Sequence, residues 1–427
     1  MRYKATFLIS LLFLVMAMSL MIIGCIDYDP AEDNDNVLKI GVLGPFSGPS
    51  EKIGREFKGA VEMAFEEIEY QIGDYKVEFV WIDSQSDPKR ATLAYEEAAK
   101  KDNIDVGLLN WHSSVAVAAM DAAARNQVPH FFGLGATDII NEKYNHDSEY
   151  YSYWMGKAWP SPDKLTSAYI EALQGPIEEG LWEPRNMKVS IYGEDTDWGK
   201  SFGAAIASDF EAAGWEIVGE HYFPAGATEL LTVINSLEDK DAAVIAGSVA
   251  TASSFTAFIE EIRKSNLQSV IIADGLGWTG EWYEMAGDNS NYVLDQVQAW
   301  TSDEAKVFKT TFKGKYGFTP STSSGGLAYD LASFFIEVAK GTLKEHGTLN
   351  RDTFYEFGQD RLWTGEISFT DGIIMNKYQY SLQTVPDPIV KDGYFMFPVI
   401  QYYKGEDHII WPEIWKESDF KPPSYLN

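Results

Sequence analysis

The sequence has little cysteine and few basic residues. Its 427 residues contain one cysteine, Cys25, which excludes an internal disulfide. Lysine and arginine number 34 against 64 aspartate and glutamate residues, a formal net charge of −30 at pH 7. Such a chain should repel nucleic acid and anionic membrane surfaces, so we expect no nucleic-acid partner. The acidic residues are spread along the chain, which is typical of a solvated acidic surface.

Motifs for catalysis and for metal or phosphate binding are also missing. The sequence has no H-E-x-x-H, no G-x-S-x-G elbow and no G-x-x-x-x-G-K-[ST] loop. The six histidines lack the spacing of metal ligands, so each is expected at the surface or in packing. Abundant carboxylates make paired acids uninformative. We therefore expect neither an enzyme, nor a cofactor, nor a metal site.

The N-terminal region has the pattern of an export signal. Arg2 and Lys4 precede the nearly apolar run Ala5–Ile23, which fits a secretory signal or a membrane anchor. The run ends in Ile-Ile-Gly-Cys, which resembles the lipoprotein box in which the peptide is cut before the cysteine and lipid is attached to it. We expect a signal peptide over 1–24 and lipid on Cys25. An uncleaved anchor and a chance cysteine remain alternatives.

A short acidic tether, 25–36, follows the predicted signal, and the folded part is expected to start near Val37. From there strand and helix patterns alternate in two series, over 37–135 and 187–275. Proline and aromatic residues interrupt the pattern at 150–163. Repeated β-α units predict parallel sheets with helices on both faces, so two series predict two α/β lobes. A helix pair and then short strands with a hairpin turn are expected after the second series.

One stretch has the spacing of a nucleotide-binding fingerprint. Gly275, Gly277 and Gly280 follow a β-branched run in G-x-G-x-x-G spacing, with Asp295 about twenty residues on. A true fingerprint follows the first strand of its lobe and opens a long helix. This one ends the second series, so we interpret the match as coincidence. The informative residue is Asp274, at the expected carboxyl end of a strand.

Small and hydroxylated residues gather at the expected carboxyl ends of strands in both series. Ser113 and Ser114 open a helix in the first series, followed by 135–137, and Ser248 ends a strand in the second. Ligands of open α/β sheets bind at this edge, where helix N-termini offer free N–H groups. Ser113 or Ser114 is expected to cap its helix, and either also has the chemistry to donate to a ligand carboxylate.

Taken in order, several segments resemble the type I periplasmic binding proteins of the branched-chain amino acid, amide and urea class. The segments are LKIGVLGPFSGPSEKIGREFKGAVEMAFEEIE, DSQSDPKRATLAYEEAAKKDNIDVGLLNWHSS, YGEDTDWGKSFGAAIASDFEAAG, FPAGATELLTVINSLEDKDAAVIAGS, KYGFTPSTSSGGLAYDLASFFIEVAKG and PVIQYYKGEDHIIWP. The resemblance covers Val37–Pro412. It implies two Rossmann-like lobes with central parallel sheets, joined by a three-crossing hinge. Lobe one would take 37–154 and 280–358, and lobe two 155–279 and 359–415, with a tail at 416–427.

The resemblance also implies roles for individual residues. Ser113 and Thr137 match positions that hold the ligand carboxylate, and Gly135 matches a position whose backbone contacts the ligand. Trp198 matches an aromatic residue that closes over the ligand. Asp274 matches the acid that pairs with the α-ammonium group. We add Trp111, Ser114 and Ser248 as expected pocket residues.

One departure from the family concerns the tyrosine that often precedes a glycine in the first helix. This chain has Ile53-Gly54 there. Trp111, His112 and Trp278 are bulky residues near the expected pocket. The ligand classes left open are amino acids (branched-chain or aromatic), amides, urea and other small polar solutes.

By this resemblance the chain would be a monomeric receptor, anchored through the lipid expected on Cys25, that captures a solute and hands it to the permease subunits of an ABC importer. A sensory protein of the same fold is the second hypothesis, and an exported enzyme is the third.

Overall fold

The computed structural model describes residues 36–426 except 266, 299 and 301. The predicted signal peptide, Cys25 and the tether up to residue 35 lie outside the described residues. Contacts divide the chain into Met1–Asn36 and Val37–Asn427, and the fold below is that of the second unit. Within the described ranges, no helix has both the length and the apolar character needed to cross a membrane.

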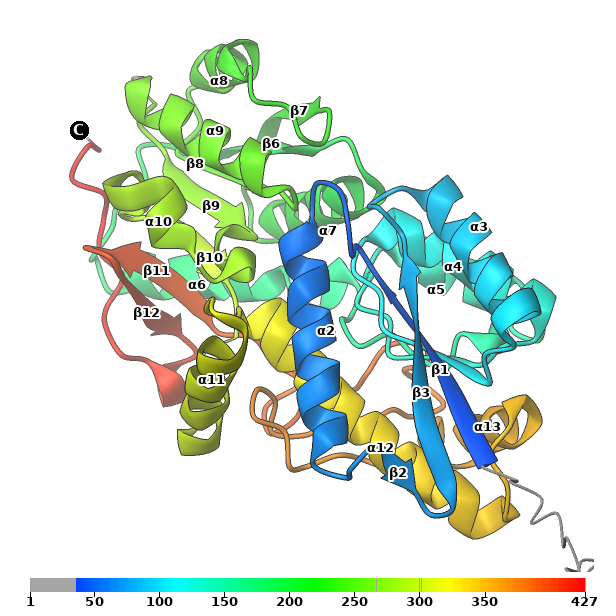
Figure 1. Cartoon of the computed structure of the whole chain (residues 1–427). Coiled ribbons are helices and arrows are strands. Elements are labelled where there is room, and N and C mark those ends of the chain that lie inside the picture. Colours follow the sequence, from blue (N-terminus) through cyan, green and yellow to red (C-terminus); the bar gives the residue numbers. More distant parts are fainter. Residues whose placement is uncertain (1–35, 266, 299, 301, 427) are drawn as a thin grey trace, which may run out of the picture. The chain divides into compact units, whose positions relative to one another are not determined.

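The first sheet has five strands in the order β2-β3-β1-β4-β5 (Figure 1). Pairing of β1 with β4, and of β4 with β5, is parallel. The strands are β1 (Asn36–Gly44), β2 (Gln71–Ile72), β3 (Tyr75–Asp83), β4 (Val106–Leu108) and β5 (His130–Phe131). With its helices, this sheet forms what we call lobe one.

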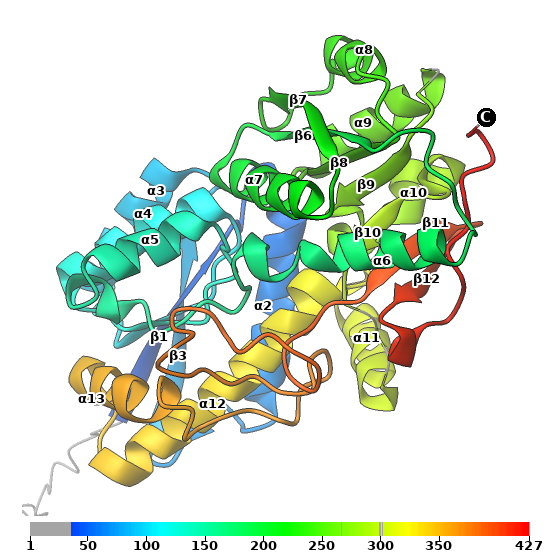
Figure 2. The same ribbon diagram turned by 180° about the vertical axis from the view of Figure 1, so that it is seen from behind.

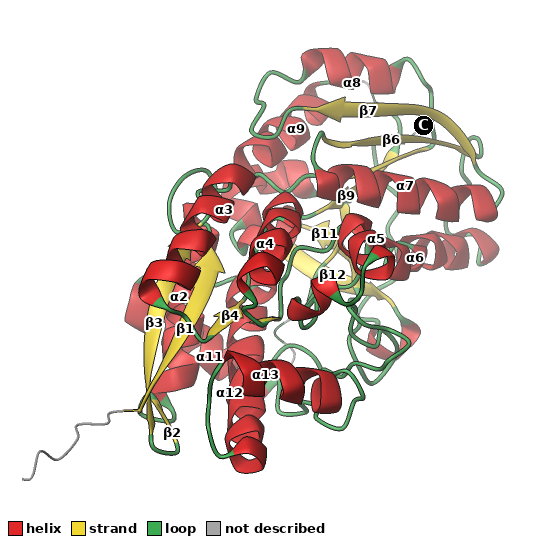
Figure 3. Ribbon diagram, turned by 90° about the vertical axis from the view of Figure 1, so that its right-hand side faces the viewer, coloured by secondary structure: helices red, strands yellow, loops and turns green. Residues whose placement is uncertain are grey.

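Helices cover both faces of this sheet because β1 carries buried apolar side chains on both of its faces. Leu38, Ile40 and Val42 pack into one cluster with α2 and α12, whereas Leu43 belongs to a second cluster with α3 and α4. Figure 3 shows these helices around the strands of lobe one. The helices of this lobe are α2 (Glu51–Glu66), α3 (Pro88–Glu97), α4 (Ser113–Asn126), α5 (Asp138–His146), α11 (Asp303–Tyr316), α12 (Leu327–His346) and α13 (Arg351–Phe357).

The second sheet has seven strands in the order β12-β11-β10-β9-β8-β6-β7. Strands β6 to β10 pair in parallel, and β11 and β12 add an antiparallel hairpin. The strands are β6 (Lys188–Glu194), β7 (Glu216–Phe223), β8 (Val244–Ser248), β9 (Val270–Asp274), β10 (Leu294–Gln296), β11 (Val399–Tyr403) and β12 (Glu406–Trp411). The helices are α6 (Ser167–Glu178), α7 (Asp197–Ala212), α8 (Leu231–Glu238), α9 (Ala252–Lys264) and α10 (Trp282–Ala286). This is lobe two.

The predicted fold class is therefore confirmed: two α/β lobes, each with a parallel core. One placement needs correction, because residues 280–358 were expected in lobe one. Strand β10 lies within that range, yet it pairs with β9 and β11 in the sheet of lobe two. The chain leaves this sheet after Gln296. Three residues of strand were too short a pattern to identify from the sequence.

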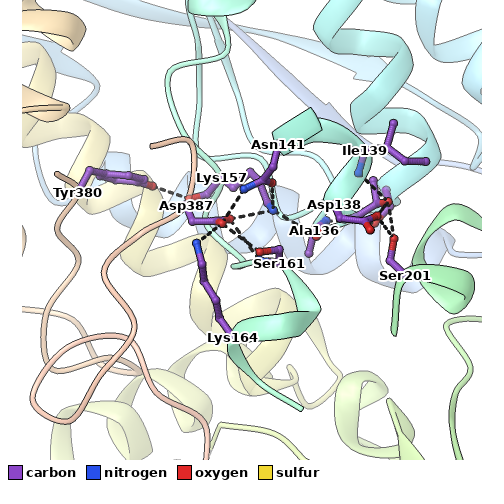
Figure 4. A network of polar contacts seen from close by, with 12 residues as sticks. Ala136, Asp138, Ile139, Asn141, Lys157, Ser161, Lys164, Ser201, Tyr380 and Asp387 are labelled. Carbon is purple, nitrogen blue, oxygen red and sulfur yellow. Dashed lines mark hydrogen bonds and ion pairs between the residues drawn. The ribbon is translucent and has the colours of Figure 1, made fainter. Parts of the chain in front are cut away.

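Two of the segments that connect the lobes meet around a buried ion pair. Residues 155–166 lead from the segment after α5 to α6, and residues 365–398 lead back to β11 along the loops drawn in orange in Figure 2. Lys157 of the first segment and Asp387 of the second are fully buried, with Nζ and Oδ1 2.8 Å apart. Lys164 also pairs with Asp387, and Asn141 donates to it at 2.7 Å (Figure 4).

Candidate functional site

A cavity of about 270 Å³ lies at the carboxyl ends of strands from both sheets. Lobe one contributes the loops after β1, β3, β4 and β5, and lobe two contributes those after β6, β7, β8 and β9. Its lining residues are mostly small, hydroxylated or aromatic. They include Ser50, Trp111, His112, Ser113, Ser114, Ala136, Trp159, Glu194, Thr196, Trp198, Gly226, Ala250, Thr251 and Trp278.

The N-terminus of α4 opens onto this cavity. Ser113 and Ser114 are its first two residues and line the wall. The expectation that one of them caps the helix is wrong, because the N-cap residue is His112, whose side chain makes no capping bond. Instead, Ser113 Oγ accepts the N–H groups of Ala136 and Thr137, at 3.0 and 3.2 Å. The Ser113 hydroxyl lines the cavity beside the first amides of α4, which have no acceptor within the helix, so both are available to an acceptor in the cavity.

His112 contributes no positive charge to the wall at neutral pH. Loss of hydration lowers the pKa of this side chain to about 4. Its Nε2 lies 3.1 Å from Ser50 Oγ.

Glu194 is the one formally charged residue in the lining. It ends β6, and its side chain is almost completely buried. The carboxylate accepts the backbone N–H of Gly226 at 3.3 Å and that of Ala250 at 3.0 Å. No salt bridge joins it to a cation in the part of the chain that the structure describes. A buried carboxylate of this kind is favourable when a ligand supplies the opposite charge.

Trp198, Ser248 and Asp274 form one hydrogen-bonded chain that runs away from the cavity. Trp198 lines the cavity and donates Nε1–H to Ser248 Oγ at 2.7 Å. Ser248 donates in turn to Asp274 Oδ2 at 3.2 Å, and Tyr169 donates to the other oxygen at 2.8 Å. Asp274 is therefore behind the aromatic wall, contrary to the expectation that it faces the cleft. Burial, and then the charge of Asp295, raises the pKa of Asp274 well above its usual range.

Asp295 explains the glycine spacing that resembled a nucleotide site. Its carboxylate accepts the N–H groups of Gly275 at 2.9 Å and Gly277 at 2.7 Å, so it fixes the loop from inside the lobe. Gly275 has a φ of 110°, which only glycine adopts readily. The loop continues as a short 3-10 helix, Leu276–Thr279, and no long helix follows it. The acid therefore binds backbone, as structural support for the wall.

Gly135 and Thr137 also lie outside the lining. Gly135 donates its N–H to Asn110 at 3.1 Å, and a Cβ added to it would lie 2.5 Å from Cβ of Ala116. Thr137 caps α5, and its Oγ1 lies 2.8 Å from Oγ of Ser201 in α7, across the lobes.

Of the eight predicted pocket residues, Trp111, Ser113, Ser114 and Trp198 meet at the cavity. Gly135, Thr137, Ser248 and Asp274 lie directly behind it. The sequence reasoning missed Glu194 and Trp159. A charge that closes the otherwise buried strand MKVSIYGE, at the edge where ligands bind, was the available signal for Glu194.

Fold and cavity together define a two-lobed protein with a cavity between its lobes, and its sequence matches a known family. Residues 37–360 match the model of the family described as periplasmic binding protein, so the chain belongs to that family. This is a family of binding proteins and not of enzymes, and its description as periplasmic indicates a location outside the cytoplasm.

Individual relatives are distant. A Leu/Ile/Val-binding protein homolog 6 from Brucella melitensis is 24% identical over 55% of this chain and 56% of its own length. The chain thus spans little more than half of that relative. A leucine-binding protein from Thermotoga maritima superposes with a TM-score of 0.68 at 18% identity, over 87% of this chain and 97% of its own. A solute-binding protein from Rhodopseudomonas palustris BisB5, in complex with 3,4-dihydroxybenzoic acid, superposes with a TM-score of 0.66 at 18% identity. The match covers 87% of this chain and 95% of that protein. At this identity the structures establish the shared fold.

Proposed function

We propose that this protein is a lipid-anchored receptor, attached through Cys25, that captures a small polar, amino-acid-like solute and delivers it to an ABC importer. The observation that carries the proposal is the chemistry of the cavity walls. One side offers the uncapped N-terminus of α4 with the hydroxyl of Ser113, and the other offers the buried carboxylate of Glu194. Donors on one side and an acceptor on the other suit a zwitterion.

Two tryptophans in the wall support a solute that carries hydrogen-bond acceptors. The indole Nε1 atoms of Trp159 and Trp278 are buried and find no partner among the described residues. Leaving such a donor unpaired costs about 1–3 kcal/mol, so an acceptor on the solute would recover part of that cost. In this assignment Ser113, Ser114, Trp111 and Trp198 contact the solute, and Ser248 and Asp274 hold Trp198 in place.

A thermal-shift screen of the purified full-length protein tests the proposal. Leucine, phenylalanine, acetamide and urea at millimolar concentration represent the candidate classes. A solute that binds only the folded state adds about 2.7 kcal/mol at a concentration of 100 times its Kd, which raises the melting temperature. Ser113→Ala should weaken the binding of that solute, whereas Ser236→Ala, on the exposed side of α8, should leave the binding unchanged. Absence of any shift with these solutes and with the alkylated ammonium compounds named below would contradict the proposal.

Uptake experiments separate import from sensing. Cells that lack the gene for this chain should take up the stabilising solute more slowly than cells that carry it. Equal uptake by both would leave a receptor without an import role.

A further inference from the structure

The most unusual feature of the cavity is its tryptophan content. Trp111, Trp159 and Trp278 line it with indole planes that are close to perpendicular, at 85°, 89° and 77° for the three pairs. Their ring centroids lie 5.5 to 6.4 Å apart, so the planes meet like the walls of a corner. Trp198 stands against Trp278 at 5.8 Å. We call these four residues the tryptophan corner.

The four residues come from different parts of the chain, so the corner exists only in the folded protein. Trp111 follows β4 in lobe one, and Trp159 lies in the connection between the lobes. Trp198 is in α7, and Trp278 follows β9. A solute inside the corner would therefore contact both lobes at once.

The charge next to this corner has one sign. Glu194 is negative, His112 is neutral at physiological pH, and no lysine or arginine lines the cavity in the described part of the chain. Indole faces are negative at their centres and attract cations, most strongly when the cation is desolvated. Carboxylate and aromatic faces thus favour the same kind of group, which is a cation.

The kind of cation follows from the number of acceptors. A primary ammonium has three N–H donors, and each needs an acceptor when it is buried. The indole rings of the corner offer donors and π faces but no acceptor, so a primary ammonium there would depend on the lining hydroxyls and on Glu194, whose two oxygens already accept backbone N–H groups. An ammonium whose hydrogens are replaced by alkyl groups needs no such acceptors and can contact several ring faces.

We infer that the solute carries an alkylated, permanently charged ammonium group, held in the tryptophan corner beside Glu194. The inference rests on the proposed function, since it concerns the same cavity. The N-terminus of α4 then receives an anionic end, which makes a betaine-type zwitterion the matching solute class.

Matched pairs of probes test charge separately from shape. Glycine betaine and tert-butylacetic acid share their outline, but only the betaine has a positive nitrogen. Choline and tetramethylammonium extend the cationic set, and glycine and leucine supply primary ammonium groups. We expect at least one alkylated cation to raise the melting temperature and to bind in calorimetry. Tert-butylacetic acid should bind at least tenfold more weakly than glycine betaine.

The alternatives give different patterns. Equal binding of tert-butylacetic acid and glycine betaine would make the corner an apolar pocket and overturn the inference. Binding of leucine or an amide, with none of the alkylated cations, would also overturn it and would leave the proposed receptor function standing. No shift with any solute of either panel would overturn both.

Variants identify the residues responsible. Glu194→Gln keeps the size and one acceptor oxygen of the side chain but removes the charge, so binding of the cation should weaken roughly thirtyfold or more. Glu216→Gln, on the exposed start of β7, is the matched control and should bind normally. Trp159→Leu should weaken the binding of the cation. Trp159→Phe keeps a π face, so it should retain part of the affinity that Trp159→Leu loses. Unchanged affinity in Glu194→Gln, with an unchanged melting temperature of the free protein, would contradict the assignment.

Discussion

At the scale of single residues, this protein places charges in its interior where several segments converge. Asp387 accepts from Lys157, Lys164, Ser161 and Asn141, and it lies where two connections between the lobes meet. Burial opposes its charge, but the two lysines outweigh that effect and lower the pKa of Asp387. Lys157 has Asp387 as its ion-pair partner and also donates to Ala136 and Asn141. The two ends of this pair are therefore not equivalent.

Their inequality predicts an order of stability losses. Asp387→Asn strands two lysines, one of them fully buried, and should lower the free energy of unfolding by about 3–5 kcal/mol. Lys157→Met should lower the free energy of unfolding by less, because Asp387 keeps its contacts with Lys164 and Ser161. Lys164→Met should cost least, since its side chain is one-third exposed. Urea unfolding of the three variants measures the order, and equal losses would show that the network does not act through Asp387.

At the scale of elements, periodicity predicted the long helices and the buried strands. The alternation expected over 37–135 and 187–275 appears as strands β1 to β5 and β6 to β9 with helices between them. Short elements such as β10 had too few residues to show a pattern. Glu194 was missed for a different reason: its two backbone donors, Gly226 and Ala250, follow other strands, and a single sequence does not reveal which loops converge.

One contact between elements should be visible as a pH dependence. Asp330 of α12 accepts the backbone N–H groups of Ile373, Ile374 and Met375 and the hydroxyl of Tyr378. Burial nevertheless raises the pKa of Asp330 from 3.8 to about 6. The folded state therefore holds this proton more tightly than the unfolded state, so the contribution of Asp330 is greatest below pH 4 and is lost as pH rises to about 6.

The measurement is the free energy of unfolding between pH 4 and pH 7 for the native chain and for Asp330→Asn. The native chain should lose up to about 3 kcal/mol more than the variant over this range. Asp392→Asn removes an exposed carboxylate of the adjoining loop and should follow the native curve. Parallel curves for the native chain and Asp330→Asn would mean that Asp330 titrates normally.

At the scale of the whole folded unit, the proposed capture of a solute depends on how the lobes are held together. The cavity takes walls from both lobes, so a solute in it links them. One direct link lies beside the cavity: Ser201 of α7 bonds to Thr137 at 2.8 Å and also donates to Asp138 at the start of α5 (Figure 4). A bond of this kind stabilises the arrangement in which the lobes touch and leaves the interior of each lobe unaffected.

Ser201→Ala should therefore shift the equilibrium between arrangements without unfolding either lobe. A hydrogen bond to a charged group contributes about 1.5–3 kcal/mol, so the apparent affinity for the captured solute should fall by roughly tenfold. X-ray scattering should give a larger radius of gyration for the free variant than for the free native protein, and saturating solute should bring both to the same compact value. Ser236→Ala serves as the control, because its hydroxyl bonds within α8. Identical scattering with and without a tightly bound solute would exclude closure, and the loss of affinity would then have to come from the site itself.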